Sequence, residues 1–388
     1  MMSNAKKWFI SLLHSFLLLI LTALWMNSPN IYDNEASIIK WSSFVKNLFF
    51  KTGKKISPDE FIFLDLSHEK TVIPDEHGTS VITDRKKLAE LFQIIKPQQH
   101  QVKYILCDVE LRDKSPDDEL LQKSVYGIDN LIFAKSYNED EQVEEPGFKV
   151  NQGITDYKMS DGQFIKLNLF QKDSISTLPV LMYSYLTKNS IRTVKPFHIQ
   201  DGTLCFNYLI TDYKIRPYEL FKTKTYPLMR LSDLLSLRNN GIINSILKGR
   251  IIVMGDFEND VHETVFGSAP GSLILLNVYL SMLDGKHLVD YWWVAYLILV
   301  YTIFSRIMLF HVSNYKKKRI SWIGPLIKSA VFLSLCSILS YLLFSHHLQV
   351  AFLTIYISGI TFLIQLYKRP KHWKYYFKMK FKEIKESI

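Results

Sequence analysis

Four long apolar segments interrupt the chain, and a large mixed region lies between the first and the second. The apolar segments span residues 8–26, 291–311, 322–344 and 350–367. A helix needs about 20 predominantly apolar residues to cross the hydrocarbon core of a bilayer. The pattern therefore predicts four transmembrane helices, with residues 28–290 forming one domain between the first and second helix.

The first apolar segment also admits another interpretation. A cleaved signal peptide has a short apolar core, but a small-x-small cleavage site does not follow Trp25. Trp8 and Trp25 stand at the two ends of the segment, as is typical of residues at a membrane interface. We therefore expect a retained membrane anchor.

Within residues 28–290, short continuous apolar runs alternate with stretches of helical periodicity. Buried strands are predicted at 61–64, 104–107, 131–134, 204–208 and 251–254, and helices at 84–95, 177–187 and 273–283. A further helix is predicted to begin at 115–118, and Asp161-Gly162 predicts a hairpin between 154–159 and 163–170. Continuous apolar strands alternating with helices predict a three-layer α/β domain with a mostly parallel sheet.

Charge is unevenly distributed along the chain, which carries a net charge of +10. Residues 28–290 carry a net charge of −4 and the rest carries +14. Lys and Arg are enriched on the cytoplasmic side of membrane proteins. We therefore expect residues 1–7 and the tail 368–388 in the cytoplasm, residues 28–290 outside the inner membrane, and no nucleic-acid partner.

The basic tail mixes cations with aromatic side chains. This composition suits a helix on the anionic inner leaflet, whereas RNA binding is favoured less. The residues expected to contact the membrane surface are Lys368, Arg369, Lys371, Trp373, Lys374 and Lys378.

Isolated polar and thiol groups have simple structural explanations. Arg306 and Lys328 lie near cytoplasmic span ends, so snorkelling to the headgroups is favoured over a transport path. Cys107, Cys205 and Cys336 fall in predicted strands or a span, so we expect buried thiols instead of a disulfide.

Three carboxylates follow predicted strands. Asp65, Asp108 and Asp256 would meet in one crevice if their strands are parallel neighbours, although each could instead cap a local turn. The alternating polar loop from Asp256 to His262 could hold a divalent cation, but a solvated acidic loop is favoured because EF-hand spacing is lacking. Catalytic and phosphate-binding motifs are lacking as well, so we expect no enzyme activity, cofactor or metal.

The order of several short motifs between residues 58 and 288 resembles the type-2 CHASE domain, an extracytoplasmic sensory module of bacterial cyclases and kinases. No single motif is specific, but their order and the flanking spans agree with the family. The motifs are 61–67, Asp108 with 115–120, Asp161-Gly162, 249–255, Asp260 with Thr264, and Pro270-Gly271 with Asn277.

The resemblance implies a ligand site and also shows departures from the family pattern. Val265 replaces a proline, and Leu273, Leu275 and Leu276 stand where polar or small residues are usual. If the last helix lines the site, this site is more apolar or has lost its ligand. The candidate ligand-binding residues are Asp65, Ser67, Asp108, Asp256, Asp260, Thr264 and Asn277.

Only 21 residues follow Tyr367, too few for a cyclase or kinase domain. We therefore expect a bacterial membrane sensor that binds a small ligand or a periplasmic protein and signals through its spans to a separate cytoplasmic or membrane output protein. The sequence leaves both a monomer and a homodimer open. A docking subunit of an envelope complex, or a hydrolase using Asp65, Asp108 and Asp256, are the alternatives.

Overall fold

The fold is taken from a computed structural model of the chain. It describes residues 2–28, 33–49, 56–75, 78–138, 142–143, 149–157, 159, 162–172, 174–194, 197–211, 213–237, 239–311 and 323–368. The chain forms two compact units, one of Asn47–Val289 and one of Met1–Lys46 with Asp290–Ile388.

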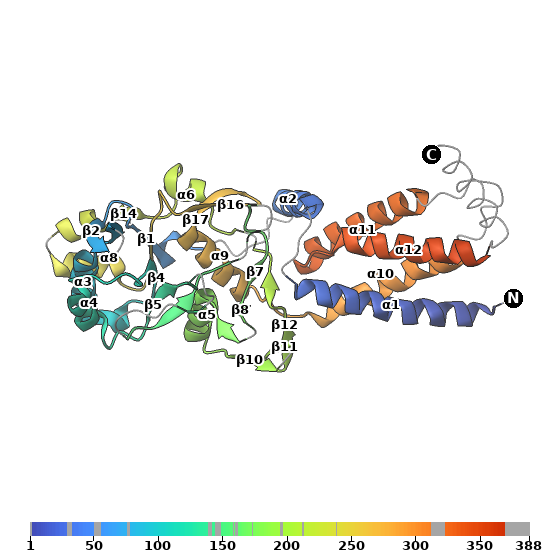
Figure 1. The fold of residues 1–388 in the computed structure, drawn as a ribbon, viewed down its shortest axis with the longest axis horizontal. Helices are drawn as coiled ribbons and strands as arrows, with labels where there is room; N and C mark the ends of the chain where they lie inside the picture. The colour runs from blue at the N-terminus through green and yellow to red at the C-terminus, as the bar shows by residue number, and fades with distance from the viewer. Residues whose placement is uncertain are drawn as a thin grey trace. The chain divides into compact units, whose positions relative to one another are not determined.

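A six-stranded sheet is the centre of the unit Asn47–Val289 (Figure 1). All neighbouring strands in it are parallel, in the order β14-β1-β15-β4-β5-β6. The strands are β1 (Phe61–Asp65), β4 (Tyr104–Glu110), β5 (Leu131–Lys135), β6 (Gln152–Ile154), β14 (Leu228–Arg230) and β15 (Ile251–Gly255).

Both faces of the sheet are covered, which explains why its strands read as continuous apolar runs. In β1, Phe61 and Phe63 enter one core, while Ile62 and Leu64 enter the other. Successive strand residues point to opposite faces, so each strand serves both cores. The unit therefore has three layers, as predicted.

Figure 1 places different helices on the two faces of the sheet. The core containing Ile62 is completed by α3 (Arg85–Ile95), α4 (Asp118–Val125), α7 (Leu231–Ser236) and α8 (Asn240–Leu247). The core containing Phe61 is completed by α5 (Leu178–Thr187), α6 (Pro217–Phe221) and α9 (Gly271–Leu283). Short 3-10 turns occupy Pro58–Glu60 and Lys96–Gln101.

Small antiparallel sheets surround the central one. They pair β2 (Lys70–Asp75) with β3 (Gly78–Thr83), β7 (Leu167–Asn168) with β13 (Tyr208–Leu209), β8 (Phe170–Gln171) with β9 (Ile175–Ser176), and β16 (Val261–Thr264) with β17 (Gly267–Pro270). A three-stranded sheet contains β10 (Ile191–Val194), β11 (Phe197–Gln200) and β12 (Thr203–Cys205).

Three local predictions are wrong in whole or in part. The hairpin expected at Asp161-Gly162 is replaced by other pairings, because β6 joins β5 in parallel and Phe164 bridges to Thr264; Asp161 itself lies outside the described residues. The expected strand 204–208 is divided between β12 and β13. The helix predicted to open at 115–118 begins within this range, at Asp118, but its N-cap is Asp117 and not Ser115.

The second unit is helical. It contains α1 (Asn4–Met26), α2 (Asp33–Phe49, assigned to this unit as far as Lys46), α10 (Tyr291–Arg306) continued by a π-turn over Ile307–His311, α11 (Ile323–Phe344) and α12 (Val350–Lys368). Sequence analysis did not predict α2. In the part of the chain that is described, two helical stretches are long and apolar enough to cross a membrane, Asn4–Met26 and Tyr291–Phe310.

Helices also occupy the third and fourth predicted spans. Their described apolar stretches, Ser329–Phe344 and Val350–Leu363, are shorter than the length needed to cross a membrane, so the prediction of four spans is not confirmed. The side chain of Lys328 and the tail after Lys368 lie outside the described residues, as does the side chain of Lys368. The membrane-surface role of Lys368, Arg369, Lys371, Trp373, Lys374 and Lys378 therefore stays a prediction. The cysteines Cys107, Cys205 and Cys336 are free and buried, as expected.

Candidate functional site

The predicted carboxylates lie at the carboxyl ends of neighbouring strands, where open parallel sheets bind ligands. Asp65 is the last residue of β1, and Asp256 follows β15 directly. Asp108 lies inside β4, where the pairing with β5 shifts register between Cys107 and Glu110. The three residues therefore begin from the same edge of the sheet.

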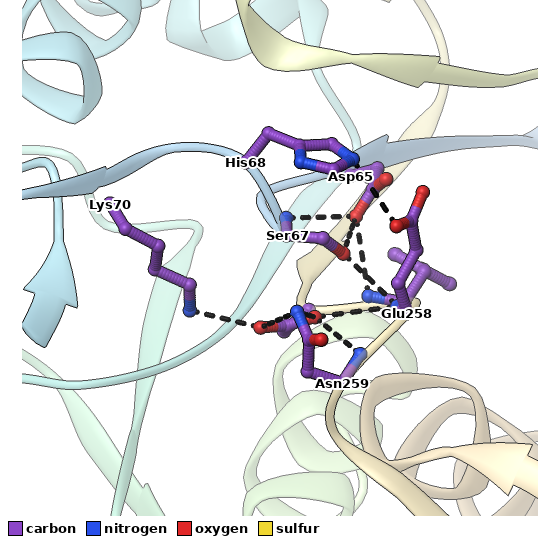
Figure 2. Close-up of polar contacts among 8 residues, drawn as sticks. Asp65, Ser67, His68, Lys70, Glu258 and Asn259 are labelled. Carbon is purple, nitrogen blue, oxygen red and sulfur yellow. Dashed lines mark hydrogen bonds and ion pairs between the residues drawn. The ribbon is translucent and has the colours of Figure 1, made fainter.

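Asp65 and Ser67 tie the loop after β1 to the loop after β15 (Figure 2). The Asp65 Oδ1 atom accepts hydrogen bonds from the Ser67 amide at 3.0 Å, from the Ser67 hydroxyl and from the Phe257 amide at 3.3 Å. The Ser67 hydroxyl accepts from the Glu258 amide at 3.0 Å. Both side chains are buried, so their polar atoms are used within the protein.

Asp256 closes the same network on its outer side. Its carboxylate accepts hydrogen bonds from the Asn259 amide at 2.8 Å and from the Asn259 side chain, and it pairs with Lys70 at 3.0 Å. Partial burial opposes ionisation, but these donors outweigh it and hold the pKa of Asp256 below its usual range. His68 and Glu258 approach to 3.2 Å beside it.

A separate cavity of about 230 Å³ lies between β4, the segment after β6 and the start of α9. Neither Asp65 nor Asp256 lines it, whereas Asp108 and Asp260 do. Its lining combines carboxylates with aromatic and aliphatic side chains: Asp108, Glu110, Thr155, Asp156, Tyr157, Phe164, Asp260, His262, Gly271, Ile274 and Leu275.

Two glycines allow the strand ends and α9 to approach each other. A Cβ atom at Gly271 would overlap the Asp260 carboxylate and lie 3.3 Å from Asp108 Oδ2. A Cβ atom at Gly255 would lie 2.8 Å from the Ser272 side chain and 3.4 Å from Asp108 Cβ. The two carboxylates therefore meet over the first residue of α9.

Burial, followed by the nearby carboxylates of Asp260 and Glu110, raises the pKa of Asp108 well above its usual value. The other acids of the cavity have partners: Asp260 pairs with His262 at 2.8 Å, Glu110 lies 3.7 Å from Arg112, and Asp156 accepts a hydrogen bond from the Tyr137 amide. The described structure provides Asp108 with no comparable donor.

Comparison with known protein families matches a CHASE2 domain to residues 65–310. This range covers more than half of the chain and includes every residue of the cavity lining. The chain belongs to the CHASE2 domain family. CHASE2 domains are sensory extracellular domains. No curated protein and no solved structure matches the chain.

Two further residues that the family resemblance singles out form hydrogen bonds to backbone groups within the CHASE2 domain. The Thr264 hydroxyl donates to the Gly267 carbonyl at 2.6 Å and accepts from the Phe266 amide at 3.1 Å, which closes the turn between β16 and β17. Asn277 is fully buried in α9, and its side chain binds the backbone N–H and C=O of Ile215. Their ligand-binding role stays a prediction.

The seven candidates of the CHASE2 domain thus fall into separate places. Asp65, Ser67 and Asp256 form the loop network, and Asp108 and Asp260 line the cavity. Thr264 closes the turn between β16 and β17, and Asn277 binds α9 to the segment around Ile215. Sequence reasoning missed Asp156, Tyr157 and Phe164. A usable signal was present for Asp156, because it lies two residues after the short strand β6, near the carboxyl end of the sheet.

The leucines that depart from the family pattern have different positions. Leu275 lines the cavity beside Ile274, whereas Leu273 and Leu276 are buried in the core that contains Phe61. Part of the cavity wall is therefore apolar. Within the described ranges, His, Cys, Asp and Glu form no group of three or more that could hold a metal ion.

The segment between α9 and α10 is held by backbone and side-chain hydrogen bonds. The Val289 amide donates to the Leu204 carbonyl and the Phe206 amide donates to the His287 carbonyl, each at 2.8 Å. The His287 ring bonds Gln200, and burial lowers the pKa of His287 to about 4, so the ring is neutral at pH 7. One helix thus runs from the cavity to a clamped segment immediately before α10.

Proposed function

We propose that this CHASE2 protein is a membrane-bound sensor of a small ligand outside the cell's inner membrane. The ligand binds in the cavity beside Asp108, and the response passes through α9 and α10 to a separate output protein. The observation that carries this proposal is that the first turn of α9 forms a wall of the cavity. The chain origin is proposed to be bacterial.

The position and size of the cavity support ligand binding. It lies at the carboxyl ends of parallel strands, the usual ligand edge of such sheets. Its volume of about 230 Å³ is below the roughly 300–1,000 Å³ that is typical of drug-sized ligands. A small molecule is therefore the expected occupant.

The route out of the cavity supports signal transmission. Ile274 and Leu275 line the cavity on α9, α9 ends at Leu283, and α10 begins at Tyr291. A ligand that prefers one position of α9 shifts the population of that position, and it can do so only by its difference in affinity. A tenfold difference in affinity corresponds to about 1.4 kcal/mol.

Contacts between α1 and α10 support the proposed sidedness. Ser15 and Thr302 hydroxyls lie 3.1 Å apart, Thr22 and Tyr301 hydroxyls lie 2.8 Å apart, and Arg306 bonds Asn4. The start of α1 thus meets the end of α10, so the pair is antiparallel. An antiparallel pair would return the chain to the side where it began and leave residues 28–290 on the opposite side; the Lys and Arg distribution then favours the outside for residues 28–290.

The finer topology is also part of this proposal. We propose that α11 and α12 are the third and fourth spans, with both chain ends in the cytoplasm. The excess of Lys and Arg outside residues 28–290 supports this orientation. Ser345 to Gln349, between α11 and α12, contains no Lys or Arg and would face outward.

Binding, and not catalysis, is the proposed role of the CHASE2 domain. A hydrolase using Asp65, Asp108 and Asp256 needs all three carboxylates at one substrate. Asp65 and Asp256 are instead occupied by hydrogen bonds within their loops, and Asp108 alone of the three lines the cavity. This arrangement favours a sensor.

Ligand binding can be tested on the full chain in lipid nanodiscs. Small molecules and periplasmic extracts would be screened by thermal shift against wild type and the cavity-filling variant Leu275→Trp. Ile242→Trp is the matched control, because Ile242 is exposed on α8. A shift seen in wild type and the control but lost in Leu275→Trp is expected; a shift unaffected by Leu275→Trp would contradict binding in this cavity.

A further inference from the structure

The charges around the cavity are of one sign. Asp108, Glu110, Asp156 and Asp260 line it, and Lys and Arg are missing from its described lining. Arg112 approaches Glu110 from a mostly exposed position and neutralises part of this charge at the edge. A cation can therefore enter at lower electrostatic cost than an anion.

Two polar groups of the cavity are available to a ligand. The Asp108 carboxylate is partly buried beside Asp260 and lacks a hydrogen-bond donor among the described residues. The Tyr157 hydroxyl is buried and lacks a geometrically sound hydrogen bond; its neighbour Thr177 already donates to the Leu169 carbonyl at 2.9 Å. Buried polar groups without partners are costly and mark sites where a partner is missing.

The remaining wall is suited to carbon and to a diffuse positive charge. Ile274 and Leu275 provide an aliphatic surface, and Phe164 and Tyr157 provide aromatic rings. Ammonium groups bind to carboxylates and also to the faces of aromatic rings. Calcium, in contrast, takes six to eight oxygen ligands. A wall that is partly aliphatic and aromatic is poorly suited to provide that many oxygen atoms around one ion.

We propose that the cavity of the CHASE2 domain binds a small organic cation, an ammonium group on a short apolar body, with the Asp108 carboxylate as its ion-pair partner. This inference rests on the proposed ligand-sensing function and adds the chemical class of the ligand. The ammonium group lies between Asp108 and Asp260, and its carbon chain lies against Ile274 and Leu275.

The N-terminus of α9 offers another explanation for the Asp108 and Asp260 carboxylates. A helix N-terminus carries a partial positive charge, so Asp108 and Asp260 could serve only to stabilise it. The Gly271 amide, however, donates to the Asp260 backbone carbonyl at 2.9 Å, and a side-chain cap is lacking at Pro270. Stabilisation of the helix alone would predict loss of stability, but no loss of cation binding, when Asp108 is changed.

Cation binding should be coupled to proton release. The groups facing Asp108 are Glu110 on β4, Asp260 and His262 from the β15–β16 region, and Asp156 and Tyr157 after β6. Burial and the neighbouring carboxylates favour the protonated form of Asp108, and an incoming cation favours the ionised form, so cation binding should displace protons from this carboxyl group. Affinity for the cation should therefore increase as the pH rises.

The test compares butylammonium, 1-butanol, butyrate and Ca²⁺ as probes on the full chain in nanodiscs, by calorimetry in buffers of different ionisation enthalpy. Butylammonium is expected to bind wild type saturably with release of protons. Asp108→Asn should weaken this binding by about tenfold or more and abolish the proton release. Asp129→Asn, on an exposed loop, should leave both unchanged.

Several results would overturn the cation assignment. These are equal binding of 1-butanol, preferential binding of butyrate or Ca²⁺, absence of butylammonium binding at millimolar concentration, or binding that persists in a folded Asp108→Asn protein. If another class of ligand binds and Leu275→Trp abolishes that binding, the cation assignment fails while ligand sensing stands. If Leu275→Trp affects no ligand, the sensing proposal itself fails.

Discussion

Asn277 holds α9 against the segment around Ile215. Its side-chain amide donates to the Ile215 carbonyl at 2.9 Å and to the Leu273 carbonyl at 2.8 Å, and its oxygen accepts from the Ile215 amide at 3.1 Å. The side chain is completely buried. Its removal therefore leaves the Ile215 backbone groups without partners in a place that water reaches poorly.

We expect Asn277→Ala to lower the free energy of unfolding by about 3 kcal/mol, because each buried polar group left unpaired costs about 1–3 kcal/mol. Chemical denaturation of the full chain measures this change. Asn259→Ala, at an exposed position, is the control and should cost much less. A loss below about 1 kcal/mol for Asn277→Ala would contradict the structural role assigned to this side chain.

Asp108 should make stability depend on pH. Its pKa is raised in the folded chain, so the folded state keeps a proton that the unfolded chain loses above about pH 4. Unfolding then releases a proton, and stability falls as the pH rises towards the raised pKa.

Asp108→Asn should remove this slope and raise the melting temperature at neutral pH relative to wild type. Melting curves of both proteins over a pH series give the difference, in which the other titrating groups largely cancel. A parallel pH dependence of the two proteins would show that Asp108 is ionised in the folded state.

At this scale the sequence locates the polar residues but not their partners. The resemblance to the sensory family singles out both Asp65 and Asp108, yet one closes a loop network and the other lines the cavity. Asn277 meets Ile215 across 62 residues of sequence. Such pairings depend on tertiary packing, which local patterns do not contain.

Among the elements, the buried strands and long helices follow from local sequence. Continuous apolar runs predict the first residues of β1, β4, β5 and β15, and the helix predicted over 84–95 is α3, for which Asp84 is the N-cap. The hairpin at Asp161-Gly162 fails because a turn dipeptide specifies a local bend but not the strands it joins. The helix α2 is not among the predicted elements, although Ile38, Trp41, Val45 and Leu48 recur at helical spacing within it.

Gly271 is expected to be more important for the cavity than for the fold. Gly271→Ala places a methyl group against the Asp260 carboxylate, which can move because it is the end of a side chain. Ligand binding should weaken while stability changes by less than about 1 kcal/mol. Thermal shift with and without the ligand found in the screen measures both effects.

Gly255→Ala is the contrasting variant. Its methyl group would lie 2.8 Å from Ser272 Cβ on α9, so helix and strand must separate, at a cost of about 1–3 kcal/mol. Equal stability losses for the two variants would contradict the view that only Gly255 is needed for packing of α9 on the sheet.

The α1–α10 pair offers a readout of transmission. The hydroxyls of Ser15 and Thr302 lie 3.1 Å apart, so cysteines at these two positions should form a disulfide under mild oxidation. The rate of cross-linking is expected to change several-fold when ligand occupies the cavity, if binding moves α10 relative to α1. An unchanged rate with saturating ligand would contradict transmission through this pair.

At the scale of the whole molecule, the segregation of charge predicts more than any single motif. Residues 28–290 are slightly acidic and the flanking segments are strongly basic, and residues 65–310 match a family of sensory extracellular domains. Chain length and composition do not identify a ligand. That information lies in the cavity, whose lining comes from five separate segments of sequence: 108–110, 155–157, 164, 260–262 and 271–275.

The location of the CHASE2 domain outside the cytoplasm is the claim on which the sensor account depends, and cysteine labelling tests it directly. Tyr126 is 76% exposed in the domain, while Cys107, Cys205 and Cys336 are buried and should react little. Intact bacterial cells producing Tyr126→Cys or the tail variant Ser387→Cys would be treated with a membrane-impermeant maleimide. The account predicts labelling of Tyr126→Cys in intact cells and of Ser387→Cys only after permeabilisation; the reverse pattern would contradict it.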